Sequence, residues 1–286
     1  MNGLVLEGGG LRGLFTAGVL DVWMEHHLAF DGLIGVSAGA CFGCNWKSRQ
    51  PGRVIRYNLR FARDPRYCSL RSLLSTGDLF NADFCYRALP DELDPFDGAA
   101  FAADPTAFFC VATDCETARP VYRRCDRADR ETLDWIRASA SMPLVARPVE
   151  INGRRYLDGG ISDAIPLAYF ESIGYDRNVV ITTRPADYRK VPNAGIRLFK
   201  PFLRHEPAVY SALLDRHIRY NSTMDLIAER VRQGRVLVIS PDVALPIGRV
   251  CHAPERMRCV YALGRTAGEK ALDRLGQFLN AKGNGR

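Results

Sequence analysis

Short apolar runs along the chain alternate with longer stretches in which apolar residues recur at helical spacing. The runs cover residues 3–7, 33–36, 107–114, 178–184 and 235–240. Their length and continuous hydrophobicity are typical of strands buried on both faces of a sheet. Helices are predicted at 14–27, 134–145, 207–233 and 254–281, and a further helix of small residues begins at 37. This alternation predicts an α/β fold, a three-layer α/β/α sandwich around a mainly parallel central sheet.

Two regions depart from the simple alternation. Residues 46–100 are rich in charge and contain the turn signals Asp64-Pro65, Leu89-Pro90 and Asp94-Pro95, so we expect helices and loops there. Residues 120–124 have the pattern of a strand that pairs with 107–114. We therefore expect a core at 1–190, with 46–100 inserted in it, and a C-terminal α/β extension at 191–286 packed on that core.

The composition is that of a globular protein, since 47% of the 286 residues are hydrophobic and 25% are charged. No segment has the ~20 uncharged apolar residues of a membrane span, and no signal peptide is recognisable at the N-terminus. These features predict a cytoplasmic protein. The nine cysteines are scattered, which favours free thiols packed as small hydrophobes. Cys41 and Cys44 form a lone C-x-x-C without a second pair or suitably spaced histidines, so we expect no metal site.

The net charge of +7 is concentrated in residues 46–75. This segment has eight basic residues and one acid, Asp64, whereas the rest of the chain has 31 of each sign. The basic residues are Lys47, Arg49, Arg53, Arg56, Arg60, Arg63, Arg66 and Arg71. Four of them, at 53, 56, 60 and 63, have helical spacing and would share a face, with Tyr57 and Phe61 beside them. Such a face is either a solvated surface with snorkelling stems or a contact with an anionic membrane. No nucleic-acid recognition motif accompanies it.

A glycine-rich loop, GGGLRG at residues 8–13, follows the first predicted strand. Its G-x-G-x-x-G spacing is that of a dinucleotide-binding turn. A dinucleotide site also needs an acid at the end of the second strand, where this chain has Val36-Ser37, and Asp31 precedes that strand. No Gly-Lys-Ser/Thr follows the loop, so a P-loop is disfavoured as well. We expect no nucleotide cofactor, and the alternative occupant is the oxyanion of an acyl-transfer intermediate.

The second strand ends in GVSAG at residues 35–39, which matches the nucleophile-elbow pattern G-x-S-x-G. The pattern needs small residues around the serine because the chain turns sharply from strand to helix, and Gly35 and Gly39 meet that need. Ser37 would lie at a helix N-terminus, which stabilises a developing anion. The alternative is that Ser37 is only a helix N-cap between two packing glycines.

A base is needed to take the proton of Ser37. None of the five histidines, His26, His27, His205, His217 and His252, has a glycine-turn context that would present it to a site. Asp158 has such a context, in Leu157-Asp158-Gly159-Gly160 at a predicted strand end. A partly desolvated aspartate within hydrogen-bond reach of the serine could accept its proton. The alternative is an aspartate that only forms a turn before two glycines.

Taken together, GGGLRG, GVSAG and DGG, in this order at residues 8, 35 and 158, resemble the patatin-like phospholipase family of serine acyl hydrolases. The block ASASMPLV at 138–145 resembles the block that precedes the family's aspartate. The resemblance covers residues 4–167 and continues more weakly into the C-terminal part. It implies a patatin-like fold, and it implies hydrolysis of acyl esters of phospholipids, lysophospholipids or related lipids without a metal or other cofactor.

The resemblance also implies a role for each site residue. Ser37 would be the nucleophile and Asp158 the base, and the reaction would pass through an acyl-enzyme. The oxyanion hole would be formed by the backbone of Gly9, Gly10 and Leu11, with Arg12 nearby. The expected partner is a lipid or acyl-ester substrate, and no nucleic acid is expected. For residues 46–75, contact with the inner face of an anionic membrane and a solvated surface both stay open. The rival interpretation is a catalytically idle membrane-binding or regulatory protein on the same fold.

Overall fold

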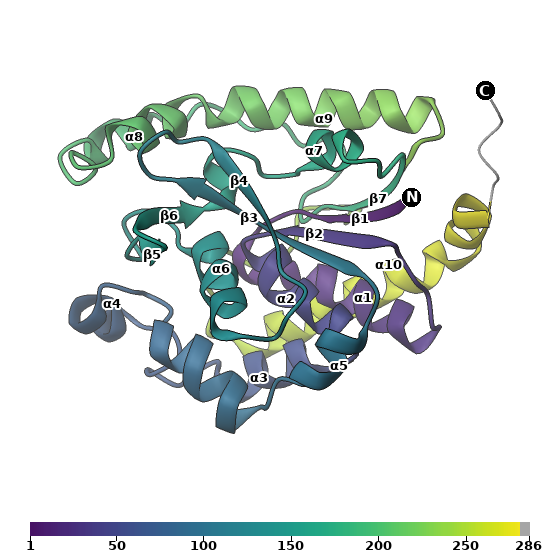
Figure 1. Ribbon diagram of the computed structural model, residues 1–286, viewed down its shortest axis with the longest axis horizontal. Coiled ribbons are helices and arrows are strands. Elements are labelled where there is room, and N and C mark those ends of the chain that lie inside the picture. Colours follow the sequence, from purple (N-terminus) through teal and green to yellow (C-terminus); the bar gives the residue numbers. More distant parts are fainter. Residues whose placement is uncertain (281–286) are drawn as a thin grey trace.

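The computed structural model describes residues 1–280 and is built around one mainly parallel sheet (Figure 1). The sheet has eight strands in the order β5-β6-β3-β2-β1-β7-β8, and β4 pairs with β3. The pairs from β3 through β2, β1 and β7 to β8 are parallel, and the β3–β4, β3–β6 and β5–β6 pairs are antiparallel. The strands are β1 Asn2–Leu6, β2 Gly32–Val36, β3 Ala107–Asp114, β4 Pro120–Arg124, β5 Val149–Ile151, β6 Arg154–Asp158, β7 Arg177–Ile181 and β8 Val236–Ile239.

Helices cover both faces of this sheet, so the predicted three-layer architecture is confirmed (Figure 1). The α-helices are α1 Leu14–Glu25, α2 Ala38–Lys47, α3 Arg53–Phe61, α4 Leu70–Thr76, α5 Gly98–Ala103, α6 Arg130–Ala140, α7 Leu167–Ser172, α8 Pro207–Leu214, α9 Arg216–Arg232 and α10 Pro254–Asn280. Three 3-10 turns, η1 Gly10–Gly13, η3 Gly159–Ile161 and η4 Ala194–Phe199, and a π-helix, η2 Phe84–Leu93, complete the fold.

The two faces of the sheet each carry a hydrophobic core. Along β1, Leu4 and Leu6 point to the face covered by α1, α2, α6 and α10. Val5 points to the opposite face, where it packs with residues of α7 and α9. This alternation follows from the two-residue period of a strand, and it explains why the strands read as continuous apolar runs.

Several predicted boundaries need correction. The predicted helix 134–145 spans Arg130–Ala140, because the Asp129 side chain caps it by accepting from the Thr132 N–H, while Ser141 leaves helical geometry. The predicted helix 207–233 is two helices, α8 and α9, which meet at Asp215. The strand β5 was not predicted. The last helix reaches Asn280, and the predicted end at 281 lies outside the described residues.

The C-terminal part continues the architecture of the first part. The strand β8 pairs in parallel with β7, and α10 lies along α1 (Figure 1). The Trp23 indole donates to the carbonyl of Gly268 at 3.1 Å, and the Tyr261 hydroxyl donates to Asp21 at 2.6 Å. The expected boundary near residue 190 stays a prediction.

The basic segment forms α3 and α4 in the region below the sheet in Figure 1. The expected exposed face of α3 is wrong for Arg53, which is only 4% exposed. Its guanidinium donates to the carbonyl of Asp94 at 2.6 Å, and Arg56 forms an ion pair with the Asp94 carboxylate at 2.8 Å. Tyr57 and Phe61 are buried. Asp94, which lies later in the chain, thus compensates part of the positive charge of the basic segment.

Candidate active site

The parallel pairing of β1 with β2 sets the glycine loop beside the serine. Leu6, near the end of β1, is in register with Gly35, near the end of β2, so both strands end at the same edge of the sheet. A Cβ added at Gly8 would lie 2.8 Å from the Cβ of Ser37. The glycine loop and the predicted elbow therefore form one site.

Ser37 has the strained backbone expected of a nucleophile elbow. Its φ of 56° and ψ of −124° lie in a region that side chains rarely adopt. The backbone of Gly35 packs closely against that of Gly39 in this turn. A Cβ at Gly35 would lie 2.5 Å from the Gly39 backbone, so only glycine fits at position 35. The Ser37 N–H donates to the hydroxyl of Ser139, on α6, at 2.8 Å. The Ser37 side chain makes no capping hydrogen bond to α2, which argues against the alternative that Ser37 is only a helix N-cap.

The Ser37 hydroxyl donates instead to Asp158, from Oγ to Oδ2 at 2.6 Å. Asp158 is the last residue of β6, and its other carboxylate oxygen accepts from the Gly160 N–H at 2.7 Å. Burial raises the pKa of Asp158, although the hydrogen bond from Ser37, the charge of Arg216 and the Gly160 N–H oppose the rise. A carboxylate held in this way is a stronger base than an exposed one and is already aligned with the serine proton.

Histidine is not the hydrogen-bond partner of the serine. His217 lines the same cleft as Ser37 and Asp158, which the sequence analysis did not anticipate. Its Nδ1 lies 3.0 Å from the carbonyl oxygen of Leu214. Among residues 1–280, Asp158 is the side chain that hydrogen-bonds the serine hydroxyl.

The predicted oxyanion-hole residues line the same cavities as the serine, but one of their N–H groups already has a hydrogen-bond partner. Gly10 has a φ of +58°, and a Cβ there would lie 2.5 Å from the carbonyl oxygen of Arg249. The Leu11 N–H donates to that same carbonyl at 3.0 Å, so we remove Leu11 from the expected donors. This leaves the N–H groups of Gly9 and Gly10. The Arg12 side chain is buried, and burial lowers its pKa to about 10.

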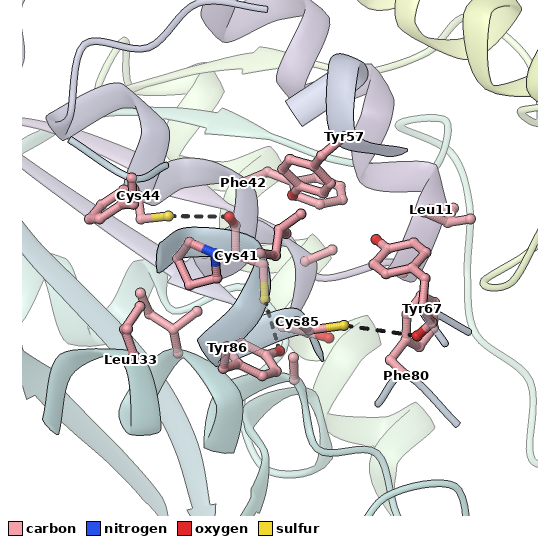
Figure 2. A pocket seen from close by; sticks show the side chains of 18 of the residues that line it. Leu11, Cys41, Phe42, Cys44, Tyr57, Tyr67, Phe80, Cys85, Tyr86 and Leu133 are labelled. Atoms are coloured by element: carbon pink, nitrogen blue, oxygen red, sulfur yellow. Dashed lines mark hydrogen bonds between the residues drawn. The ribbon is translucent and has the colours of Figure 1, made fainter. Parts of the chain in front are cut away.

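Ser37 lies between two cavities of different character. One has a volume of about 140 Å³ and is lined mainly by apolar, aromatic and cysteine side chains (Figure 2). In that view the Cys41 sulfur faces the Tyr86 hydroxyl, 3.6 Å away, and Cys44 points back to the carbonyl of Cys41. The other is a cleft of about 730 Å³ that contains Asp158 and the glycine loop. The serine therefore connects a small apolar chamber with a large cleft that is lined by both charged and apolar side chains.

The cysteines of the apolar cavity are not poised for chemistry of their own. All nine cysteines are free. Burial raises the pKa of Cys41 to about 11 and that of Cys44 to about 12, so both remain neutral thiols near pH 7. Within residues 1–280, no three His, Cys, Asp or Glu side chains gather in a way that could hold a metal ion.

Several supporting contacts of the site were not predicted from the sequence, although Ser139 lies in the block 138–145 that resembles the family. Ser139 holds the elbow N–H, and Thr113 donates from its hydroxyl to the Asp158 carbonyl at 2.8 Å. The Arg216 guanidinium, at the start of α9, donates to the carbonyl of Gly160. Each is distant in sequence from the residue it supports, so no local pattern could reveal the contact.

The sequence profile of the family described as patatin-like phospholipase matches residues 4–171. The chain belongs to the patatin-like phospholipase family. The resemblance inferred from the three motifs is thus confirmed. A second profile, described as a domain of unknown function, DUF6363, matches residues 206–280.

Curated relatives extend this patatin-like assignment. The "Uncharacterized protein YjjU" of Escherichia coli is 31% identical over 98% of this chain and 79% of its own length. An "Uncharacterized NTE family protein" of Mycobacterium bovis is 27% identical over 79% of this chain, which spans 58% of that relative. The lysophospholipase NTE1 of Candida glabrata is 24% identical over 84% of this chain, which spans 14% of that protein.

Membrane contact through residues 46–75 stays a prediction for this patatin-like protein, and co-sedimentation with anionic and neutral vesicles is its test. In the part of the chain from 1 to 280, no helix combines the length and hydrophobicity needed to cross a bilayer.

The strained backbone of Ser37 generates a prediction about stability. We expect Ser37→Gly to be about 1 kcal/mol more stable than Ser37→Ala, because glycine relieves the strain by more than it adds unfolded-state entropy. Urea unfolding of the two variants measures the difference. The matched pair Ser75→Gly and Ser75→Ala, at an exposed position in the helix α4, should show the opposite order. A glycine variant at 37 no more stable than the alanine variant would contradict the strain.

Proposed function

We propose that this protein is a serine acyl hydrolase that cleaves acyl esters of phospholipids or lysophospholipids through a dyad of Ser37 and Asp158. The observation that carries the proposal is the 2.6 Å hydrogen bond from Ser37 Oγ to Asp158 Oδ2 at the strained elbow. Family membership supports lipid hydrolysis as the reaction class. The relative named as a lysophospholipase supports a lysophospholipid as one substrate.

Acylation follows from the positions of these groups. Ser37 Oγ attacks the ester carbonyl carbon while its proton passes to Asp158 Oδ2. The oxyanion that forms is stabilised by the N–H groups of Gly9 and Gly10 and by the N-terminus of α2. When the intermediate collapses, the bond to the alcohol oxygen breaks and the alcohol takes the proton from Asp158. The acyl group is then an ester of Ser37.

In deacylation, water takes the role of the nucleophile and Ser37 becomes the leaving group. A water molecule attacks the acyl carbonyl and gives its proton to Asp158, and the same N–H groups stabilise the second oxyanion. The bond from the acyl carbon to Ser37 Oγ breaks, and the serine regains its proton from Asp158. The fatty acid is released and the dyad returns to its starting state without a cofactor.

The apolar cavity is the natural place for the acyl chain. Its volume of about 140 Å³ is similar to that of an engineered apolar cavity of about 150 Å³ that binds benzene. It therefore holds roughly six carbon atoms. This size favours short acyl groups, or the carbonyl-proximal part of a longer chain.

Removal of either dyad member should abolish turnover. We expect Ser37→Ala and Asp158→Asn to lower kcat for a short-chain ester by about 10⁴-fold or more, because the nucleophile or its base is lost. His217→Gln should retain activity, since that side chain does not bond the serine. Labelling by a fluorophosphonate probe, which reacts with an activated serine, should disappear in Ser37→Ala.

A folding control accompanies the dyad variants. Because the folded-state pKa of Asp158 is raised, its ionisation destabilises the fold at pH values above that pKa. Asp158→Asn should therefore unfold at or above the wild-type temperature near pH 7. Wild type that is folded, inactive on esters and unlabelled by the probe would support the idle regulatory protein instead.

The pH profile should report the buried base. Asp158 must be ionised to accept a proton, so kcat/KM should fall as the pH drops through a pKa above the ~3.9 of a free aspartate. The charge of Arg216 lowers this pKa, so Arg216→Gln should move the acid limb to higher pH. Arg232→Gln, at the exposed far end of the same helix, should leave the limb in place. An acid limb at or below pH 4 would argue against Asp158 as the base.

Acyl-chain preference should depend on the apolar cavity. Leu133 lines it, so Leu133→Ala should enlarge it and shift the optimum of kcat/KM towards longer p-nitrophenyl esters by about two carbons. Leu74→Ala, at a position 88% exposed, makes the same change away from the cavity and should leave the optimum unchanged. An identical chain-length profile in all three proteins would place the acyl chain elsewhere.

A further inference from the structure

The charged side chains that line the large cleft beside Ser37 have an excess of positive charge. Its lining residues in the described part of the chain include two acids, Glu7 and Asp158, and five cations. The acids are already engaged, since Glu7 accepts from the Tyr220 hydroxyl at 2.9 Å and Asp158 from Ser37. The cations are Arg12, Arg184, Lys190, Arg216 and Arg249.

These five cations take part in none of the ion pairs found within residues 1–280. Arg12 is only 8% exposed, and its buried Nε has no hydrogen-bond partner in that part of the chain. A buried charged donor without a partner is costly, and native proteins normally satisfy such groups. Arg12 also lines the cleft, so its uncompensated charge adds to the cationic character of this space and favours an anionic ligand.

Two tyrosines hold cations of the cluster without neutralising them. The Lys190 ammonium lies 4.0 Å from the ring centre of Tyr220, and the Arg184 guanidinium lies 4.9 Å from that of Tyr188. The two rings contact each other edge to face at 5.9 Å. Cation–π contacts fix a cation in place without neutralising it.

The cations also repel one another. Burial lowers the pKa of Lys190 to about 7, and the charges of Arg216, Arg249 and Arg12 add to this effect, while the charge of Glu7 opposes it. Arg184 and Arg249 lower the pKa of Arg12 in the same way. An anion bound among these groups would relieve the repulsion, whereas a cation brought there would increase it.

We propose that this cluster is a subsite for the phosphate of the lipid headgroup, and that it favours a phosphomonoester over a phosphocholine. The inference rests on the proposed function, because it places the headgroup in the cleft while the acyl chain enters the apolar cavity. A phosphomonoester carries up to two negative charges and no cation, and it matches both the charge and the fork geometry of the guanidinium groups. The quaternary ammonium of choline would lie among like charges.

Four of the five cations lie outside residues 4–171, which match the family profile. Arg184 and Lys190 follow β7, Arg216 begins α9, and Arg249 belongs to the loop between β8 and α10. Most of the subsite is therefore contributed by residues that follow the segment matched by the family profile, whereas both residues of the dyad lie within that segment.

The first test compares lysolipids that share one acyl chain. We expect kcat/KM of wild type to be at least about tenfold higher for lysophosphatidic acid than for lysophosphatidylcholine, as for one charge-assisted hydrogen bond. Lys190→Gln and Arg249→Gln should each lower this ratio several-fold. Lys200→Gln, which removes an exposed cation that does not line the cleft, should leave it unchanged. Equal kcat/KM for both lipids in wild type would overturn the subsite.

The second test does not depend on turnover. Full-length Ser37→Ala is titrated by calorimetry with hexanoyl lysophosphatidic acid, sn-glycerol 3-phosphate and inorganic phosphate. We expect the lipid to bind most tightly, and Lys190→Gln to weaken it by about tenfold. Failure of hydrolysis with this binding intact would reject the proposed activity and keep the phosphate subsite. No binding of the lipid, or binding no tighter than that of inorganic phosphate, would overturn the headgroup assignment.

Discussion

The parallel register of β1 and β2 is the constraint on which the site depends. Because of this register both strands end at one edge of the sheet, and the glycine loop that follows β1 lies beside the serine that follows β2. Asp158 reaches the same place from the antiparallel strand β6, where it lies opposite Ala112 of β3. Three neighbouring backbone segments thus fix the proposed nucleophile, its proposed base and the proposed anion donors. This arrangement explains why residues separated by more than a hundred positions are aligned to within a hydrogen bond.

The fold accepts two local costs at this edge. Ser37 keeps a backbone conformation unfavourable for a side chain, and Asp158 keeps a carboxylate out of water. Neither cost is useful for folding, and both are tolerated because the two hydrophobic cores stabilise the sheet on either side. The hydrogen bond from the Ser37 N–H to the Ser139 hydroxyl, and that from the Arg216 guanidinium to the carbonyl of Gly160, keep the strained groups in place. Strain and desolvation gathered at one point are typical of a reactive site.

Features that depend on local sequence were predictable, and those that depend on distant partners were not. The buried strands, the elbow at Ser37 and the turn at Asp158 follow from apolar runs and glycine spacing. The burial of Arg53 does not, because its partner Asp94 lies 41 residues away. The same holds for Leu11, whose N–H is taken by a carbonyl at 249. The cationic side of the cleft was invisible in the charge count, since the residues that form it lie outside the basic segment at 46–75.

The unequal size of the two spaces around Ser37 also bears on the order in which products leave and water enters. The apolar chamber is small, whereas the cleft is wide and contains Asp158. In a hydrolase with this layout, the alcohol product departs through the cleft while the acyl group is still anchored. Water can then reach the ester through the passage that the departing alcohol has vacated. The alcohol would then leave, and water would enter, through the same passage. Slow release of a tightly bound alcohol would therefore delay hydrolysis of the acyl-enzyme.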